Sequence, residues 1–116
     1  MKNVASVFLA LLCFTASCKT LTSNTKIKPK DSFILGNNQH GPFQVKLKNV
    51  SENELFVHRA PVSGGKHSEE KVLPNKQTTV KVESDTALVI ENRSNEAASV
   101  DLYITGDTGL SMGYKN

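Results

Sequence analysis

The sequence predicts an all-β protein, a small antiparallel β-sandwich or small barrel of about seven or eight short strands. Apolar and polar residues alternate with a period of two in several segments, a pattern that buries one face of a strand and exposes the other. Turn-forming residues recur roughly every 8–12 residues, as is typical of folds built from short strands. No long window has the spacing of an amphipathic helix.

The expected strands follow from this alternation. Phe43, Val45 and Leu47 alternate with polar residues, as do the apolar residues of 98–105. Residues 87–90 are continuously apolar, which is typical of a strand covered on both faces. The expected strands lie near residues 33–36, 42–49, 54–60, 69–73, 77–83, 86–92, 98–105 and 110–114.

Two similar turns punctuate the domain. Asn49-Val50-Ser51 follows one expected strand and Asn92-Arg93-Ser94 follows another, and acidic or amide residues continue each turn. We therefore expect two similar hairpins that close face to face as a sandwich. These hairpins would pair strand 42–49 with 54–60 and strand 86–92 with 98–105. A simpler interpretation is that such turns are common between strands.

The N-terminal segment has the layout of a cleaved secretory signal. Residues 1–3 carry one lysine, and residues 4–14 form an apolar run of 11 residues broken only by Ser6. A bilayer span needs about 20 apolar residues, so this run is too short to remain as one. We therefore exclude residues 1–17 from the fold and place a single domain at residues 32–116.

Cys18 follows the small residues Thr15, Ala16 and Ser17, and this stretch resembles the lipobox of bacterial lipoprotein signal peptides. The resemblance implies that the Cys18 sulfur receives a diacylglycerol, that the chain is cut just before it, and that the new amino terminus is acylated. The same small residues would also suit an ordinary signal peptidase. Because Cys13 would leave with the signal, ordinary secretion would leave Cys18 unpaired, whereas acylation accounts for it.

As a whole, the chain is similar to small exported bacterial outer-membrane lipoproteins of the Bacteroidota type, in which a lipobox and a polar tether precede one immunoglobulin-like or related β-sandwich. Only residues 1–18 carry the specific part of this resemblance. Lys19 stands where an aspartate often retains lipoproteins at the inner membrane, and residues 19–24 lack the acidic cluster of surface-exported ones. The resemblance implies a lipid-anchored envelope protein at the outer membrane that faces the periplasm.

Residues 18–31 are expected to form a flexible tether between lipid and domain. Only Leu21 and Ile27 are large and apolar in this segment, too little to offset the entropy of ordering it. As a loose coil it would reach roughly 20 Å. Four lysines and one aspartate lie in the tether, whereas residues 32–116 carry seven lysines and two arginines against ten acids. A near-neutral domain without a basic stripe argues against nucleic-acid binding.

The sequence offers few candidates for chemistry, and we expect no enzyme and no cofactor. No nucleophile stands in a recognisable catalytic motif, and the chain has no tryptophan to build a sugar platform in a cleft. His58 and His67, with Glu69 or Glu70, would approach one another if their strands pair, which is an alternative hypothesis of a metal site. Solvated histidines are the simpler interpretation.

The C-terminal segment offers one candidate binding surface. Leu110, Met112 and Tyr114 share one face of an extended stretch. The simplest interpretation is a last strand that adds apolar cover to the core. The functional alternative is a sheet edge that accepts a partner strand through backbone hydrogen bonds.

Two functional hypotheses follow. The first is a membrane-anchored, non-enzymatic interaction or envelope-structural module. Its partners would be the lipid bilayer, through acylated Cys18, and an envelope protein or polymer. The second is a periplasmic small-ligand or metal-binding lipoprotein that uses His58 and His67. The sequence names neither the ligand nor the oligomeric state.

Replacing Cys18 with alanine tests the anchor. Without the thiol no diacylglycerol can be attached, so the Cys18→Ala protein should remain a full-length precursor that incorporates no labelled palmitate. The wild-type chain should take up the label and become shorter. A wild-type product with a free thiol would mean ordinary secretion.

Overall fold

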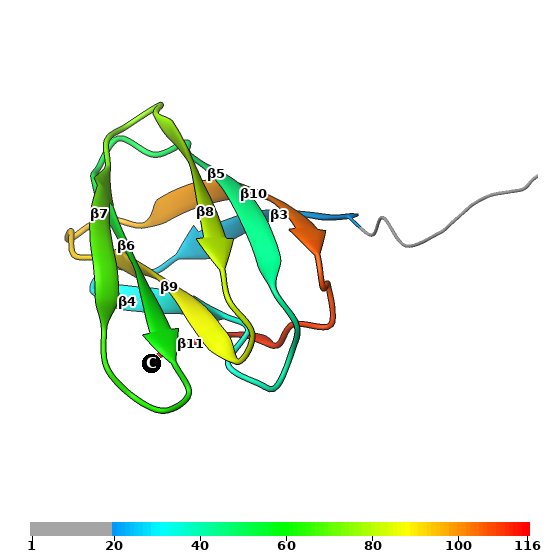
Figure 1. The fold of residues 1–116 in the computed structure, drawn as a ribbon. Coiled ribbons are helices and arrows are strands. Elements are labelled where there is room, and N and C mark those ends of the chain that lie inside the picture. Colours follow the sequence, from blue (N-terminus) through cyan, green and yellow to red (C-terminus); the bar gives the residue numbers. More distant parts are fainter. Residues whose placement is uncertain (1–19) are drawn as a thin grey trace, which may run out of the picture.

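The computed structural model describes residues 20–116, and within this range nine strands form two antiparallel sheets stacked as a sandwich (Figure 1). The expected signal peptide, residues 1–17, and the expected lipidation site, Cys18, lie outside the described residues. No helix within residues 20–116 has the length and apolarity that a bilayer span requires.

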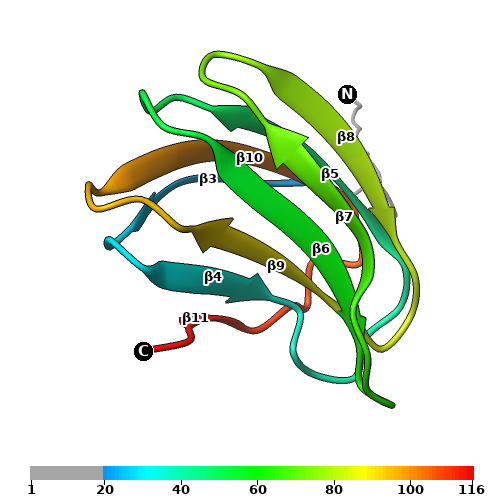
Figure 2. The same cartoon turned by 90° about the vertical axis from the view of Figure 1, so that its left-hand side faces the viewer.

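The strands are β3 (Thr20–Ile27), β4 (Asp31–Leu35), β5 (Phe43–Asn49), β6 (Leu55–Pro61), β7 (His67–Val72), β8 (Gln77–Val82), β9 (Thr86–Asn92), β10 (Ala98–Gly106) and β11 (Met112–Tyr114). One sheet has the order β3-β10-β5-β8 and the other the order β11-β4-β9-β6-β7. Figure 2 shows the two sheets stacked face to face. The predicted sandwich is therefore confirmed, and the sheets do not close into a barrel.

The core lies between the sheets and is built by the predicted alternation. Val45 and Leu47 of β5 are fully buried beside Val100 and Leu102 of β10, while the residues between them face solvent. The second sheet contributes a more continuously apolar set from β9, including Leu88. Removal of these side chains from water supplies the main driving force for folding, because burial of an aliphatic side chain contributes about 1.5–3 kcal/mol.

The predicted tether is wrong for residues 20–31. Thr20–Ile27 is the edge strand β3, which pairs over its whole length with β10, and Asp31 begins β4. Burial alternates along β3 and ends with Thr25 and Ile27 inside the core. Strand pairing satisfies the backbone of this polar segment, so a few inward side chains are enough to order it.

The two predicted hairpins are also wrong in their pairing. Strand β5 pairs with β10 and β8, whereas β6 pairs with β9 and β7. The turn after Asn49 therefore carries the chain from the four-stranded to the five-stranded sheet. The turn after Asn92 carries it back, from β9 to β10. The two turns are alike, but they are corners between sheets and not hairpins within one.

Each corner is held by a buried asparagine side chain. Asn49 and Asn92 are 0% and 1% exposed. The Asn49 amide donates to the carbonyl oxygens of Asn53 (2.7 Å) and Val72 (3.0 Å), and its oxygen accepts from the Ser51 backbone N–H (2.9 Å). A buried carboxamide thus satisfies three polar groups that a turn in the core would otherwise leave unpaired.

The Asn92 corner repeats this arrangement with equivalent partners. The Asn92 amide donates to Glu96 (2.7 Å) and Ile27 (3.1 Å) carbonyl oxygens, and its own oxygen accepts from the Ser94 backbone N–H (3.1 Å). The corners also touch each other, since the Asn53 amide donates to a Glu96 carboxylate oxygen (3.1 Å).

This repetition extends over both sheets. If β5, β6, β7 and β8 are matched with β9, β10, β3 and β4, the order of the four-stranded sheet becomes β7-β6-β9-β4. This is the order of the five-stranded sheet without its edge strand β11. The turns 28–31 and 73–76 match as well. Each has proline second and a positive φ third, at Lys30 (60°) and Asn75 (63°), the pattern of a type II turn. The fold is therefore a pseudo-twofold sandwich.

The corners predict a selective loss of stability. Asn49→Ala and Asn92→Ala should each lower the free energy of unfolding by about 2–4 kcal/mol, because buried backbone groups lose their partners. Urea denaturation followed by circular dichroism measures this. Asn37→Ala is the matched control, because Asn37 is exposed and should change stability by less than about 0.5 kcal/mol. Equal effects of all three variants would refute the role of the corners.

Candidate functional site

Polar side chains cover the outer face of the four-stranded sheet. Because Val100 and Leu102 of β10 point into the core, Asp101 and Tyr103 point outward. The strand register extends each of these positions into a row across all four strands. One row consists of Thr22, Tyr103, Lys46 and Thr79. The neighbouring row consists of Asn24, Asp101, Lys48 and Gln77.

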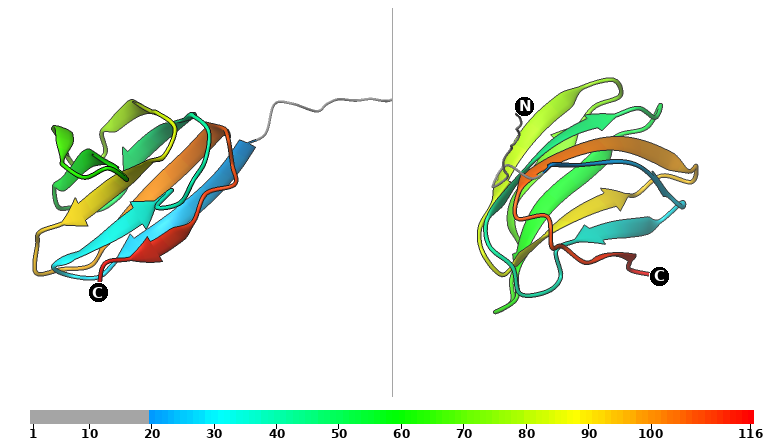
Figure 3. Two further views of the ribbon diagram at one scale, coloured as in Figure 1. Left: turned by 60° about the horizontal axis from the view of Figure 1, so that its bottom comes forward. Right: turned by 90° about the vertical axis from the view of Figure 1, so that its right-hand side faces the viewer.

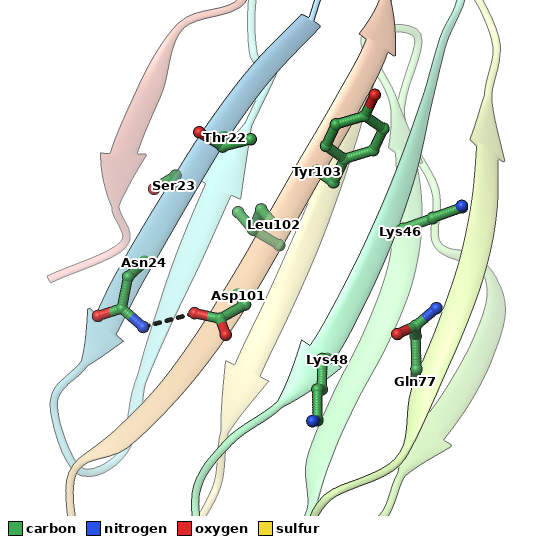
Figure 4. A pocket seen from close by; sticks show the side chains of 9 residues that line it. All are labelled: Thr22, Ser23, Asn24, Lys46, Lys48, Gln77, Asp101, Leu102 and Tyr103. Carbon is green, nitrogen blue, oxygen red and sulfur yellow. Dashed lines mark hydrogen bonds between the residues drawn. The ribbon is translucent and has the colours of Figure 1, made fainter.

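A shallow groove of about 520 Å³ runs over these rows. Figure 4 shows the residues that line it. The Asn24 amide donates to an Asp101 carboxylate oxygen at 2.7 Å. The Lys46 ammonium lies 5.9 Å from the centre of the Tyr103 ring, and Tyr103 is 43% exposed. The groove therefore offers an aromatic surface next to a cation and fixed hydrogen-bonding groups.

The charged side chains that line the groove are one carboxylate and two ammonium groups. Asp101 is the only carboxylate among the residues that line it, and it accepts the Asn24 hydrogen bond. General acid–base cleavage of a glycosidic bond would need two carboxyl groups across the site.

The ammonium groups of Lys46 and Lys48 have no ion-pair partner among residues 20–116. The free charges favour an anionic ligand.

A charged cluster lies on the five-stranded sheet. His58 on β6, Glu69 on β7 and Glu91 on β9 bring their ligand atoms within 4.8 Å of one another. Arg93 lies beside them: its Nη2 donates to Glu91 Oε1 (2.8 Å) and to Glu69 Oε1 (2.9 Å), and its guanidinium is 3.9 Å from the Phe56 ring centre. Hydrogen bonds from Lys66 and Arg93 lower the pKa of Glu69.

Burial lowers the pKa of His58 below its usual value, although the Glu91 charge acts in the opposite direction. The side chain is 11% exposed. Its Nδ1 lies 3.8 Å from Glu91 Oε1, too far for a hydrogen bond. The imidazole is therefore neutral near pH 7 beside two carboxylates.

The predicted histidine pair is only half realised. Strands β6 and β7 pair as the hypothesis required, and this pairing brings Glu69 to His58. His67 is exposed and is not a member of the cluster. His40 is buried, and one of its ring nitrogens lies 2.9 Å from the Thr86 carbonyl oxygen. Its role is therefore structural. The member that sequence reasoning missed, Glu91, comes from a strand 22 residues beyond Glu69.

The end of the C-terminal candidate segment, Met112–Tyr114, is β11, one of the two edge strands of the five-stranded sheet (Figure 3, left). Leu110 packs against the core, and Met112 and Tyr114 are about half exposed. The Tyr114 hydroxyl donates to the Lys26 carbonyl oxygen of β3 at 2.8 Å, and its ring meets Phe33 edge-on at 5.6 Å. Tyr114 thus links β11 and β3, which are edge strands of the two sheets. A role for this edge in accepting a partner strand stays a prediction.

The groove was outside the sequence predictions because three of the nine residues that line it, Thr22, Ser23 and Asn24, come from β3. Tyr103, Lys46 and Lys48 occupy outward positions of correctly predicted strands. Their neighbours Thr22 and Asn24 were assigned to the tether, although the alternation of Leu21, Ser23, Thr25 and Ile27 was a usable signal. No family model, curated protein or solved structure matches the chain, so its function is inferred from its sequence and this geometry.

Proposed function

We propose that the protein is a lipid-anchored, non-enzymatic binding module of the bacterial envelope, and that the groove on the four-stranded sheet is its binding surface. The observation that carries the proposal is the combination of the exposed Tyr103 ring with the two unpaired ammonium groups of Lys46 and Lys48. Amide and hydroxyl groups complete the groove, whose strands are held rigid by continuous pairing.

The chemistry of the groove favours an anionic polysaccharide. A tyrosine ring offers a flat apolar surface for a sugar ring, and amides bind hydroxyl groups in fixed directions. Lys46 and Lys48 alternate along β5, so their Cα atoms are about 7 Å apart on the same face. Two such charges along one groove suit a polymer that carries repeated carboxylates.

The corrected start of the fold limits where the module can lie. Only Lys19 separates Cys18 from the first residue of β3, and two residues span at most about 7 Å. An acylated Cys18 would therefore hold the Thr20 end of the sandwich at the bilayer surface, without the roughly 20 Å reach of a loose tether. The row that contains Thr22 and Tyr103 would then lie close to the membrane, where it could contact polymers near the bilayer surface.

Binding to a polyanionic polysaccharide tests the proposal. In calorimetry at low salt, the full chain should bind polygalacturonate and not neutral dextran. The Lys46→Gln/Lys48→Gln double variant and Tyr103→Ala should each weaken binding about tenfold, because exposed charge contacts and aromatic contacts each contribute on the order of 1 kcal/mol. Added salt should weaken wild-type binding.

Lys71→Gln is the matched control, because Lys71 is an exposed lysine on the other sheet, paired with Glu54. It should bind like the wild type. Equal binding by all variants, or none to polygalacturonate, would contradict the proposal. So would a protein captured by a photocrosslinker at position 103 in native envelopes, since the ligand would then be a protein.

A further inference from the structure

Three strands of the five-stranded sheet bring metal-ligating side chains together at one point. Strand β6 lies between β7 and β9, so His58 lies between Glu69 and Glu91. One ligand atom from each residue lies within 4.8 Å of the other two. This cluster is separate from the groove, which lies on the other sheet.

The Nδ1 atom of His58 is the second observation that points to a ligand. It is buried and has no hydrogen-bond partner among the described residues. Buried polar atoms are normally paired, and this one lies 3.8 Å from a carboxylate oxygen. A lone pair on Nδ1 would face negative charge, and a proton on Nδ1 would lack a good acceptor. A cation between the imidazole and the carboxylates satisfies both groups.

The carboxylates are held in place but remain available. All the hydrogen bonds and ion pairs that Glu69 and Glu91 make with Arg93 and Lys66 fall on their Oε1 atoms. Within residues 20–116, this leaves Oε2 of each carboxylate as an unused ligand atom. Arg93 stacks on Phe56, which fixes the guanidinium beside the cluster.

We propose that His58, Glu69 and Glu91 form a binding site for zinc or a related divalent transition-metal ion, with water in the remaining coordination positions. Imidazole suits zinc and related transition metals, and carboxylates complete such sites. Ligand atoms around tetrahedral zinc lie about 3.4 Å apart, so the glutamate side chains, which are 25–36% exposed, need to move by little more than 1 Å.

The neighbouring cations set the expected affinity. Arg93 and Lys66 already neutralise the two carboxylates, so a metal ion must compete with them. We expect a dissociation constant in the micromolar range, and tighter binding when Arg93 is replaced.

Calorimetry with zinc chloride at pH 7.5 tests the site. The full chain should carry Cys13→Ser and Cys18→Ser, because thiolates bind zinc. One zinc ion per chain should bind. His58→Ala and Glu91→Gln should each weaken binding at least about tenfold. Glu69→Gln should also weaken it, and this substitution is at an exposed position.

Two further variants separate a metal site from a network of ion pairs. Arg93→Gln should tighten zinc binding several-fold, because a competing cation is removed, whereas His67→Ala should leave it unchanged. Absence of binding would overturn the proposal. Zinc binding that survives both His58→Ala and Glu91→Gln, or that is lost in His67→Ala, would also overturn it.

Discussion

The sandwich depends on two buried carboxamides at the points where the chain changes sheet. Each corner must bring backbone carbonyl and N–H groups into an apolar core, where unpaired groups are costly. Asn49 and Asn92 pair these groups and also reach the ends of β7 and β3, at Val72 and Ile27. Because the second contact joins each corner to a remote strand, it fixes which strands become the edges of the sandwich as well as the local turn.

This arrangement leaves two outer faces with different chemistry. The four-stranded sheet presents polar rows and the unpaired lysines 46 and 48, while the five-stranded sheet presents acids and bases joined in one cluster around Arg93. The pseudo-twofold relation makes four strands of each sheet alike, so the chemical difference between the faces lies mainly in the outward side chains. Outward positions of a sandwich carry little of the folding energy and are therefore free to specify ligands.

The alternation of residues was sufficient to place most strands but not to pair them. Burial on one face has a local signature, as Val45 and Leu47 show, whereas pairing depends on contacts between remote segments. The Asn-x-Ser turns were recognised as alike, yet the sequence could not reveal that Asn49 bonds to Val72, 23 residues away. β3 was missed because two of its four inward residues, Ser23 and Thr25, are small and polar. Glu91 was missed because its neighbours in the cluster belong to other strands.

Hydrogen exchange of the side-chain amides of Asn49 and Asn92 tests the role of the corners most directly. If these carboxamides hold the sandwich together, nuclear magnetic resonance should show their NH₂ protons exchanging far more slowly than those of exposed Asn37, at rates that approach those of the most protected backbone amides of β5 and β9. Exchange as fast as that of Asn37, in a protein whose strand amides remain protected, would show that the corners open freely and would contradict this account.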